Sequence, residues 1–191
     1  MSLPPEIRET EIPAVLELHI PVFSDARGFF SESYNQETWA TVGFRETFVQ
    51  DNVSLSSKGV LRGLHYQLNP QGMGKLVRAI TGAVFDVAVD LRRGAPTFGQ
   101  WVGRILDAET PFWLWIPVGF AHGFVALQDN TRVYYKCTGA YNGKAERAIR
   151  HDDPDLNITW PVPATIISEK DANAPFFKDS EHNFLFNSGV D

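Results

Sequence analysis

The stretch AVFDVAVDL, residues 83–91, alternates between two kinds of side chain. One parity, from Phe85 to Leu91, is entirely large and apolar, whereas the other carries Asp86 and Asp90 among smaller residues. A period of two is typical of a β-strand with one buried face. We therefore expect the apolar parity to face the core and the two aspartates to face solvent. The alternative is an acidic pair that faces a ligand.

Other short segments repeat this alternation, among them AVLELHIPVF (14–23), KLVRAI (75–80) and RVYYKCT (132–138). Turn-forming residues separate them, as in DARG (25–28), SSKG (56–59), NPQG (69–72) and YNG (141–143). Only NQETWATVG (35–43) and SEKDANAPF (168–176) resemble helices, and both are short. Many short strands joined by such turns predict an all-β sandwich or barrel with a few short helices.

The composition favours one folded domain over residues 1–191. Hydrophobic residues make up 43% of the 191 positions and charged residues 21%, which is enough apolar material for one sizeable core. The single cysteine, Cys137, allows no intrachain disulfide and fits a reducing cytosol. The start, MSLPPEIRET, has no apolar signal-peptide core, and no uninterrupted apolar run approaches the ~20 residues that span a bilayer. We expect a cytoplasmic protein.

The formal net charge of −6 argues against nucleic acid or an anionic membrane as a partner. An anionic small molecule would need a local basic cluster. Arg62, Lys75 and Arg78 lie close together in the sequence and are candidates for that cluster. The alternative is that all of them are ordinary solvated charges.

The segment PVGFAHGF (117–124) places Pro117, Gly119 and His122 in a P-x-G-x-x-H pattern. This pattern resembles the second motif of cupins, whose fold is a small β jelly roll. Metal-binding cupins carry a first motif with H-x-H and a following glutamate. Here LHYQL (64–68) supplies His65, but Gln67 replaces the second histidine and no glutamate follows before the next predicted strand. We therefore predict a cupin-like double-stranded β-helix without a metal; the alternative is a metal-dependent cupin that uses His65 and His122 as ligands.

Without a metal, His65 in LRGLHYQ (61–67) is a candidate base, because imidazole accepts a proton near neutral pH. Arg62 has the opposite parity in a regular strand, but Gly63 marks a bulge or close approach that would turn both side chains toward one pocket. The alternative is that His65 is an inert polar residue on a strand.

A base needs an orienting partner and a group that stabilises charge. Asp171 follows the strand-like ATIIS, Lys75 begins a predicted strand just after a glycine, and Tyr134 and Tyr135 lie on opposite faces of another strand. Each has an ordinary structural alternative: a turn carboxylate, an exposed lysine and a packed tyrosine. Sequence alone does not bring Asp171 to His65.

Longer motifs point to one family. They are DARGFFSE (25–32), QDNVSLSSKGVLRGLHYQ (50–67), GKLVRAITGAVFDVAVDLR (74–92), PTFGQWVG (96–103), WIPVGFAHGF (115–124), YYKCTGAY (134–141) and SEKDANAP (168–175). Together they resemble the dTDP-4-dehydrorhamnose 3,5-epimerases and related dTDP-4-keto-6-deoxyhexose epimerases, from about Glu17 to Pro175. The resemblance implies a metal-free, cofactor-free jelly roll that acts as a homodimer on a dTDP-4-keto-6-deoxyhexose.

The resemblance also implies roles for individual residues. His65 matches the catalytic base, Asp171 its hydrogen-bond partner, Lys75 the group that stabilises an enolate oxygen, and Tyr135 the general acid on the opposite face of the sugar. Substrate-binding positions match Arg27, Phe30, Glu32, Gln50, Asn52, Arg62, His122, Tyr141 and Lys170. Of these, Arg27, Phe30 and Glu32 are expected to reach the nucleotide across the dimer, and Tyr141 to flank the base and sugar.

These roles predict inversion at C3 and C5 of dTDP-4-dehydro-6-deoxy-D-glucose, giving dTDP-4-dehydro-L-rhamnose. The 4-keto group makes the hydrogens on both neighbouring carbons acidic. Two alternatives remain open at this point. One is an epimerase that inverts C3 alone in another deoxysugar pathway, and the other is a cupin that binds sugar nucleotides without catalysis.

Overall fold

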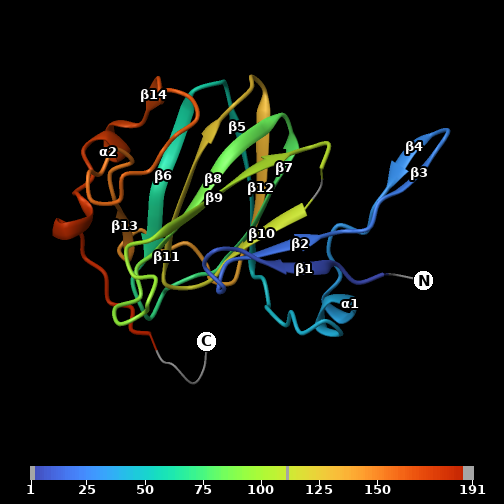
Figure 1. Cartoon of the computed structure of the whole chain (residues 1–191), viewed down its shortest axis with the longest axis horizontal. Helices are drawn as coiled ribbons and strands as arrows, with labels where there is room; N and C mark the ends of the chain where they lie inside the picture. The colour runs from blue at the N-terminus through green and yellow to red at the C-terminus, as the bar shows by residue number, and fades with distance from the viewer. Residues whose placement is uncertain (1–2, 111, 187–191) are drawn as a thin grey trace.

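A computed structural model describes residues 3–110 and 112–186 (Figure 1). Its first sheet has the strand order β1 (Glu6–Glu9), β2 (Leu16–His19), β10 (Phe112–Ile116), β7 (Lys75–Thr81), β12 (Thr131–Cys137) and β5 (Gln50–Ser56). The second has the order β13 (Glu146–Ala148), β6 (Val60–Gln67), β11 (Phe120–Ala126), β8 (Ala83–Asp90) and β9 (Trp101–Asp107), and β14 (Ile166–Ile167) pairs with β6. All pairings are antiparallel except that of β14.

The remaining elements are small. Strands β3 (Phe23–Asp25) and β4 (Gly28–Phe30) form a separate hairpin, and the helices are α1 (Gln36–Ala40), α2 (Glu169–Ala172) and the 3-10 helix η1 (Phe177–Asp179). Both α-helices lie inside the segments for which the sequence predicts them, whereas η1 follows the second of these segments. The predicted all-β architecture with a few short helices is confirmed.

The main core lies between the two sheets. Val77, Leu114 and Val133 come from the first sheet, and Val84 and Phe124 come from the second. All of them are buried. The alternating pattern of the strands thus places one apolar parity of each sheet against the other, as burial of apolar surface favours.

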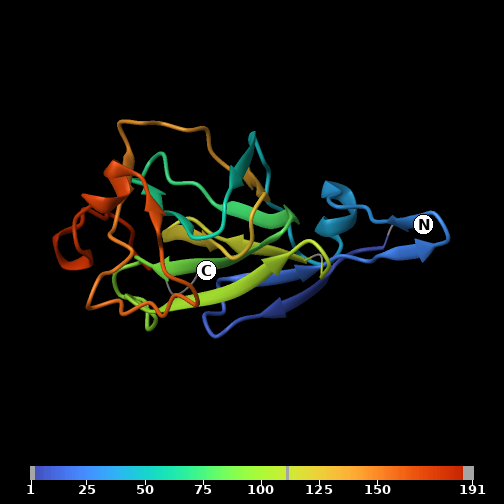
Figure 2. The ribbon, with the colours of Figure 1, turned by 90° about the horizontal axis from the view of Figure 1, so that it is seen from above.

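Each sheet also buries its outer face. Trp113 and Trp115 of β10 pack outward against Trp39 of α1 and Phe44. On the other side of the molecule, the alternate residues of β8 pack under the C-terminal segment, with Val87 in the same cluster as Phe184. Figures 1 and 2 show this segment, coloured orange to red, running along the second sheet.

The expectation that Asp86 and Asp90 face solvent is wrong. Both are fully buried, at 0% exposure, because the Phe85 parity of β8 is the outer one and is covered by the C-terminal segment. The opposite parity therefore faces the space between the sheets. Asp90 is held there by the guanidinium of Arg92 and the hydroxyl of Thr97.

Gly63 distorts β6 where the site forms. Its φ is +121°, and the pairing of β6 with β11 shifts register between His122 and Phe124. His65 pairs with His122, and Arg62 with Phe124. A Cβ at Gly63 would lie 2.5 Å from the Cα of Gly123, so the two strands approach closely only because this residue lacks a side chain. The predicted irregularity at Gly63 is confirmed.

The β3–β4 hairpin extends away from the two sheets in both views (Figures 1 and 2). Its aromatic side chains have little cover from this chain, and Phe29 and Phe30 are 66% and 68% exposed. Among the described residues, no helix has the length and apolar character that a membrane crossing requires. The predicted single domain over 1–191 includes residues outside the described ranges and stays a prediction.

Candidate active site

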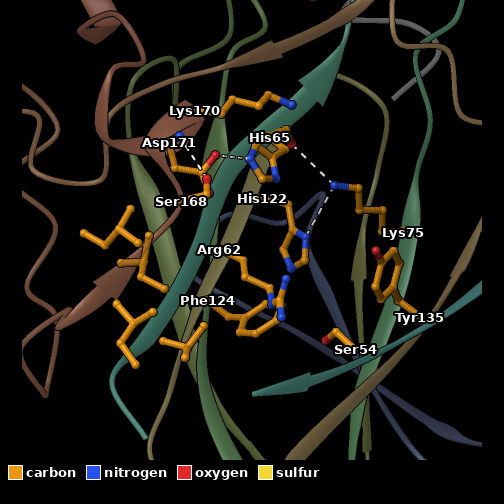
Figure 3. A pocket seen from close by; sticks show the side chains of 14 residues that line it. Ser54, Arg62, His65, Lys75, His122, Phe124, Tyr135, Ser168, Lys170 and Asp171 are labelled. Carbon is orange, nitrogen blue, oxygen red and sulfur yellow. Dashed lines mark hydrogen bonds and ion pairs between the residues drawn. The ribbon is translucent and has the colours of Figure 1, made fainter. Parts of the chain in front are cut away.

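One cavity is lined by strands of both sheets and by residues of α2 (Figure 3). It has a volume of about 520 Å³, and a neighbouring cavity has a volume of about 200 Å³. His65, Lys75 and Tyr135 line both cavities, so the two adjoin at these residues. His65 comes from β6 of the second sheet, whereas Lys75 and Tyr135 come from β7 and β12 of the first.

His65 is paired with the carboxylate of Asp171. The distance from its Nε2 to Asp171 Oδ1 is 2.6 Å, and the other oxygen, Oδ2, accepts a bond from the backbone N–H of Gly63 at 3.2 Å. Ser168 caps α2 by accepting the backbone N–H of Asp171, which fixes that residue over the strand. The Asp171 side chain is 4% exposed and that of His65 is 30% exposed. Asp171 is therefore buried behind His65, and the His65 ring is the member of the pair that a ligand in the cavity can reach.

The pKa of Asp171 lies below its usual value. Burial raises the pKa of this carboxyl, but the hydrogen bond to His65, the charge of that ring and the N–H of Gly63 together outweigh burial. Asp171 is therefore ionised at neutral pH. A carboxylate at Nε2 leaves Nδ1 of His65 as the ring nitrogen that can take a proton from a ligand.

Lys75 places an ammonium group beside the two histidines. Its Nζ lies 3.4 Å from the backbone oxygen of His65 and 3.4 Å from Nδ1 of His122 (Figure 3). Burial lowers the pKa of Lys75, and the charges of Cys137, Asp86 and Glu146 oppose this effect. A positive group in a water-poor pocket interacts strongly with any negative charge that develops near it.

Tyr135 carries a phenol into the cavity from the sheet opposite His65. Its ring packs against the central core, whereas neighbouring Tyr134 packs outward and bonds Asp51. The prediction that the two tyrosines face opposite ways is confirmed. Burial and the nearby Cys137 raise the pKa of Tyr135, with Arg62 opposing, so the hydroxyl remains protonated and can donate a proton or a hydrogen bond.

The structure gathers six of the nine residues expected to bind substrate. Arg62, His122 and Lys170 line the larger cavity, and Gln50, Asn52 and Tyr141 line the smaller one. The other three, Arg27, Phe30 and Glu32, line no described cavity of their own chain, and they lie in or next to the β3–β4 hairpin.

One candidate for the basic cluster does not reach the cavity. Arg78 does not join Arg62 and Lys75, because its position on β7 turns it outward. Its guanidinium bonds Ser33 and lies over the ring of Trp113. The basic cluster that the cavity contains is instead formed by Arg62, Lys75 and Lys170.

Two acidic residues of the site were not among the predicted site residues. Glu146 lines the smaller cavity and bonds both the hydroxyl of Tyr141 and the ammonium of Lys170. Asp86 bonds His122 from behind the larger cavity. Glu146 has no sequence signal that we can identify, whereas Asp86 belongs to the parity for which the sequence leaves an acidic pair that faces a ligand as the alternative.

Comparisons with known proteins identify the family. The family model for dTDP-4-dehydrorhamnose 3,5-epimerase matches residues 9–179. A protein of that name from Shigella flexneri is 53% identical over 175 residues, covering 91% of this chain and 97% of the relative. The chain belongs to the dTDP-4-dehydrorhamnose 3,5-epimerase family.

Solved structures extend the comparison. A 3,5-epimerase from Legionella pneumophila in complex with dTDP-4-keto-L-rhamnose superposes with a TM-score of 0.86 at 47% identity, covering 91% of this chain and 93% of that chain. A 3′-monoepimerase from Streptomyces bikiniensis in complex with dTDP-quinovose gives a TM-score of 0.82 at 33% identity, covering 88% and 86%. The predicted family and its cupin-like jelly roll are thus confirmed, and the curated relatives of this chain are sugar-nucleotide isomerases.

Proposed function

We propose that this epimerase inverts C3 and C5 of dTDP-4-dehydro-6-deoxy-D-glucose, without a metal, to give dTDP-4-dehydro-L-rhamnose. The observation that carries the proposal is the His65–Asp171 pair, which shares one cavity with Lys75 and with Tyr135 from the opposite sheet. The names of the family and of the relatives support the choice of substrate.

The first step is removal of a proton next to the ketone. His65 accepts this proton at Nδ1, while Asp171 holds the ring through Nε2 and stabilises the imidazolium that forms. C3 and C5 both flank the ketone at C4, so one base on one face of the ring can serve both carbons. The electrons of the broken C–H bond move onto the ketone oxygen as an enolate.

Lys75 stabilises the enolate oxygen. The ammonium lies 3.4 Å from the backbone oxygen of His65, so the positive charge is close to the base that generates the negative charge. Loss of one such donor typically lowers turnover by ~10²–10³. Lys75→Ala should therefore lose most turnover and remain folded.

Inversion requires the new proton to arrive from the other face of the ring. Tyr135 suits this role because it enters the cavity from the sheet opposite His65 and keeps its proton at neutral pH. The imidazolium and phenol then return to their starting states by exchange with solvent. Each inversion thus uses one base and one acid and consumes no other reactant.

The other side chains that line the two cavities suit a nucleoside diphosphate. Arg62 and Lys170 place positive charge at the larger cavity, and guanidinium groups bind phosphate oxygens in a bidentate manner. Gln50, Asn52 and Tyr141 offer amides and an exposed ring at the smaller cavity, which fits a thymine and its sugar.

Deuterium incorporation tests the proposal. The wild type is incubated with dTDP-4-dehydro-6-deoxy-D-glucose in heavy water, and each carbon is read by NMR. We expect solvent deuterium at both C3 and C5 and its loss in His65→Ala. Exchange at neither carbon would refute the proposal. If a catalytically silent wild type still binds dTDP by calorimetry, the chain is a sugar-nucleotide-binding cupin.

The similarity to a 3′-monoepimerase favours one second candidate, an enzyme that inverts C3 alone. The same catalytic residues serve both reactions, so the cavity does not separate them. Deuterium at C3 with none at C5 would identify this second function.

Metal independence has its own test. Among the residues that the structure describes, no three histidine, cysteine, aspartate or glutamate side chains form a group that could bind a metal. His65 and His122 each have a carboxylate partner instead. We expect full turnover after dialysis against a chelator and no stoichiometric metal by elemental analysis. Activity that returns only on addition of a divalent cation would contradict this part of the proposal.

We also propose that the enzyme is a homodimer in which the β3–β4 hairpin of one subunit completes the cavity of the other. Arg27, at the tip of the hairpin, has a 90% exposed side chain, and it forms an ion pair with neighbouring Asp25. The exposed Phe29 and Phe30 would be covered by such a partner.

A further inference from the structure

Asp86 is a buried carboxylate that has no role in the mechanism proposed above. It lies on β8 with 0% exposure and faces the space between the sheets. Its two oxygens lie 3.1 Å and 2.9 Å from Nε2 of His122. Burial of a charged group is unfavourable unless it is compensated, so this residue needs an explanation in terms of its partners.

The contact with Asp86 assigns the hydrogen on the His122 ring. An ionised carboxylate only accepts hydrogen bonds, so Nε2 of His122 must carry the N–H. Burial lowers the pKa of His122, and Lys75 and His65 add to this effect against the opposing charge of Asp86. The ring is therefore neutral, and Nδ1 presents an unprotonated lone pair.

That lone pair faces the ammonium of Lys75. The distance from Nδ1 to Nζ is 3.4 Å, and a neutral imidazole nitrogen accepts there while the ammonium donates. A second N–H of Lys75 points to the backbone oxygen of His65, also at 3.4 Å. An ammonium has three hydrogens, so one remains to meet an oxygen in the cavity.

The opposite tautomer would undo this arrangement. An N–H on Nδ1 of His122 would point at the N–H groups of Lys75, and the ammonium would lose its acceptor. The tautomer is thus the link between a carboxylate outside the cavity and the cation inside it. The negative charge of Asp86 also offsets the burial that lowers the pKa of Lys75.

We propose that Asp86 is a positioning residue for this reaction, which acts through the His122 tautomer to aim the Lys75 ammonium at the enolate oxygen. The proposal rests on the proposed function for its catalytic consequence. Asp86 touches neither the substrate nor Lys75 in this account, and its effect passes entirely through one imidazole ring.

The test combines kinetics with NMR on ¹⁵N-histidine-labelled protein. The variant is Asp86→Asn, and His122→Gln identifies the His122 signals among those of the five histidines. In the wild type we expect a neutral His122 ring with the hydrogen on Nε2. In Asp86→Asn we expect the Nδ1–H form to become populated, because an amide can also donate to Nε2.

We expect Asp86→Asn to change kcat and to leave KM nearly unchanged. We expect kcat of Asp86→Asn to fall by about 10-fold to 100-fold, less than for loss of a whole charge-stabilising donor. KM for the dTDP-sugar should stay near the wild-type value, because the bond from Lys75 strengthens only as the enolate forms. A residue that merely supported the fold would not change the tautomer while leaving KM intact.

Each outcome is decisive. An Nδ1–H or doubly protonated His122 in the wild type overturns the proposal even if Asp86→Asn does not fold. A folded Asp86→Asn with wild-type kcat, or with reduced kcat and an unchanged tautomer, also overturns it. If the wild type exchanges no deuterium, the proposed function fails instead, whereas the wild-type spectrum still decides the tautomer.

Discussion

At the scale of single residues, the proposed mechanism places its base and its acid on opposite sheets. His65 and Asp171 belong to the second sheet and the helix above it, whereas Tyr135 enters from the first sheet. A hexose between them would have one group on each face. In the proposed mechanism, deprotonation and reprotonation therefore fall to different residues, and a substitution should interrupt one without the other.

Tyr135→Phe should separate exchange from inversion. His65 still removes the proton and can return a deuteron to the same face, so solvent exchange continues while inverted product falls by about 10²- to 10⁴-fold. Deuterium NMR of recovered substrate, alongside chromatography of the product, measures both. Equal loss of exchange and inversion in a folded Tyr135→Phe variant would contradict the assignment of Tyr135 as the acid.

Asp171 should give the fold a pH-dependent contribution. Its folded pKa lies below the usual value, so the folded state binds fewer protons than the unfolded state in the acid range. The stability advantage of wild type over Asp171→Asn should be full above about pH 5, where an unfolded aspartate is ionised. It should shrink as the pH falls toward the folded pKa. Urea midpoints measured from pH 7 downward check this, and an advantage that grows in acid would refute it.

At the scale of elements, β6 forms the site because it is irregular. Gly63 lets β6 approach β11, and the register shift there brings His65 and Arg62 to one cavity although a regular strand would place them on opposite faces. The backbone N–H of Gly63 also bonds Asp171. One residue without a side chain thus contributes to packing, to orientation and to the electrostatics of the base.

Gly63→Ala should damage both stability and activity. The new Cβ would lie 2.5 Å from Gly123 Cα and 2.8 Å from the backbone oxygen of His122, so β6 or β11 must move. Gly94→Ala is the matched control, because Gly94 also has a positive φ, +88°, but nothing lies within 4 Å of its Cβ position. We expect the free energy of unfolding of Gly94→Ala to fall by about 1–2 kcal/mol, which is the cost of the left-handed conformation alone. The free energy of unfolding of Gly63→Ala, measured by thermal unfolding, should fall by clearly more than that of the control. A smaller fall than in Gly94→Ala would contradict the role of close strand approach at Gly63.

The element scale also shows what the sequence could predict. Parity correctly grouped the residues of β8, but it could not say which group faced the cavity, because a C-terminal segment buries the outer face as well. For the same reason Asp86 was assigned to solvent. Asp171 lies 106 positions from His65, and only the pairing of β14 with β6 and the capped α2 bring the two together. The family resemblance supplied that pair, whereas local pattern could not.

At the scale of the whole molecule, the described chain has a cavity lined in part by basic side chains. Its β3–β4 hairpin, here called the arm, does not line this cavity. Arg62 and Lys170 lie at the cavity, whereas Arg27 lies in the turn of the β3–β4 hairpin. This hairpin extends away from the two sheets (Figures 1 and 2). A two-fold symmetric dimer uses the same surfaces on both subunits, so each arm can serve the other cavity. Light scattering at micromolar concentration should therefore report a dimer.

Mixed dimers test whether the arm acts across the interface. Arg27→Ala and His65→Ala each remove a group needed by every site of their own homodimer, and both should be nearly inactive at low substrate concentration. In a mixed dimer, the subunit with an intact His65 would receive an intact Arg27 from its partner, so one of the two sites becomes complete. Random assortment of co-expressed variants should then restore about a quarter of wild-type activity, because half of the dimers are mixed and each has one working site. If Arg27 served its own cavity, no complete site would form, and the mixture would show only the residual activity of the two parents.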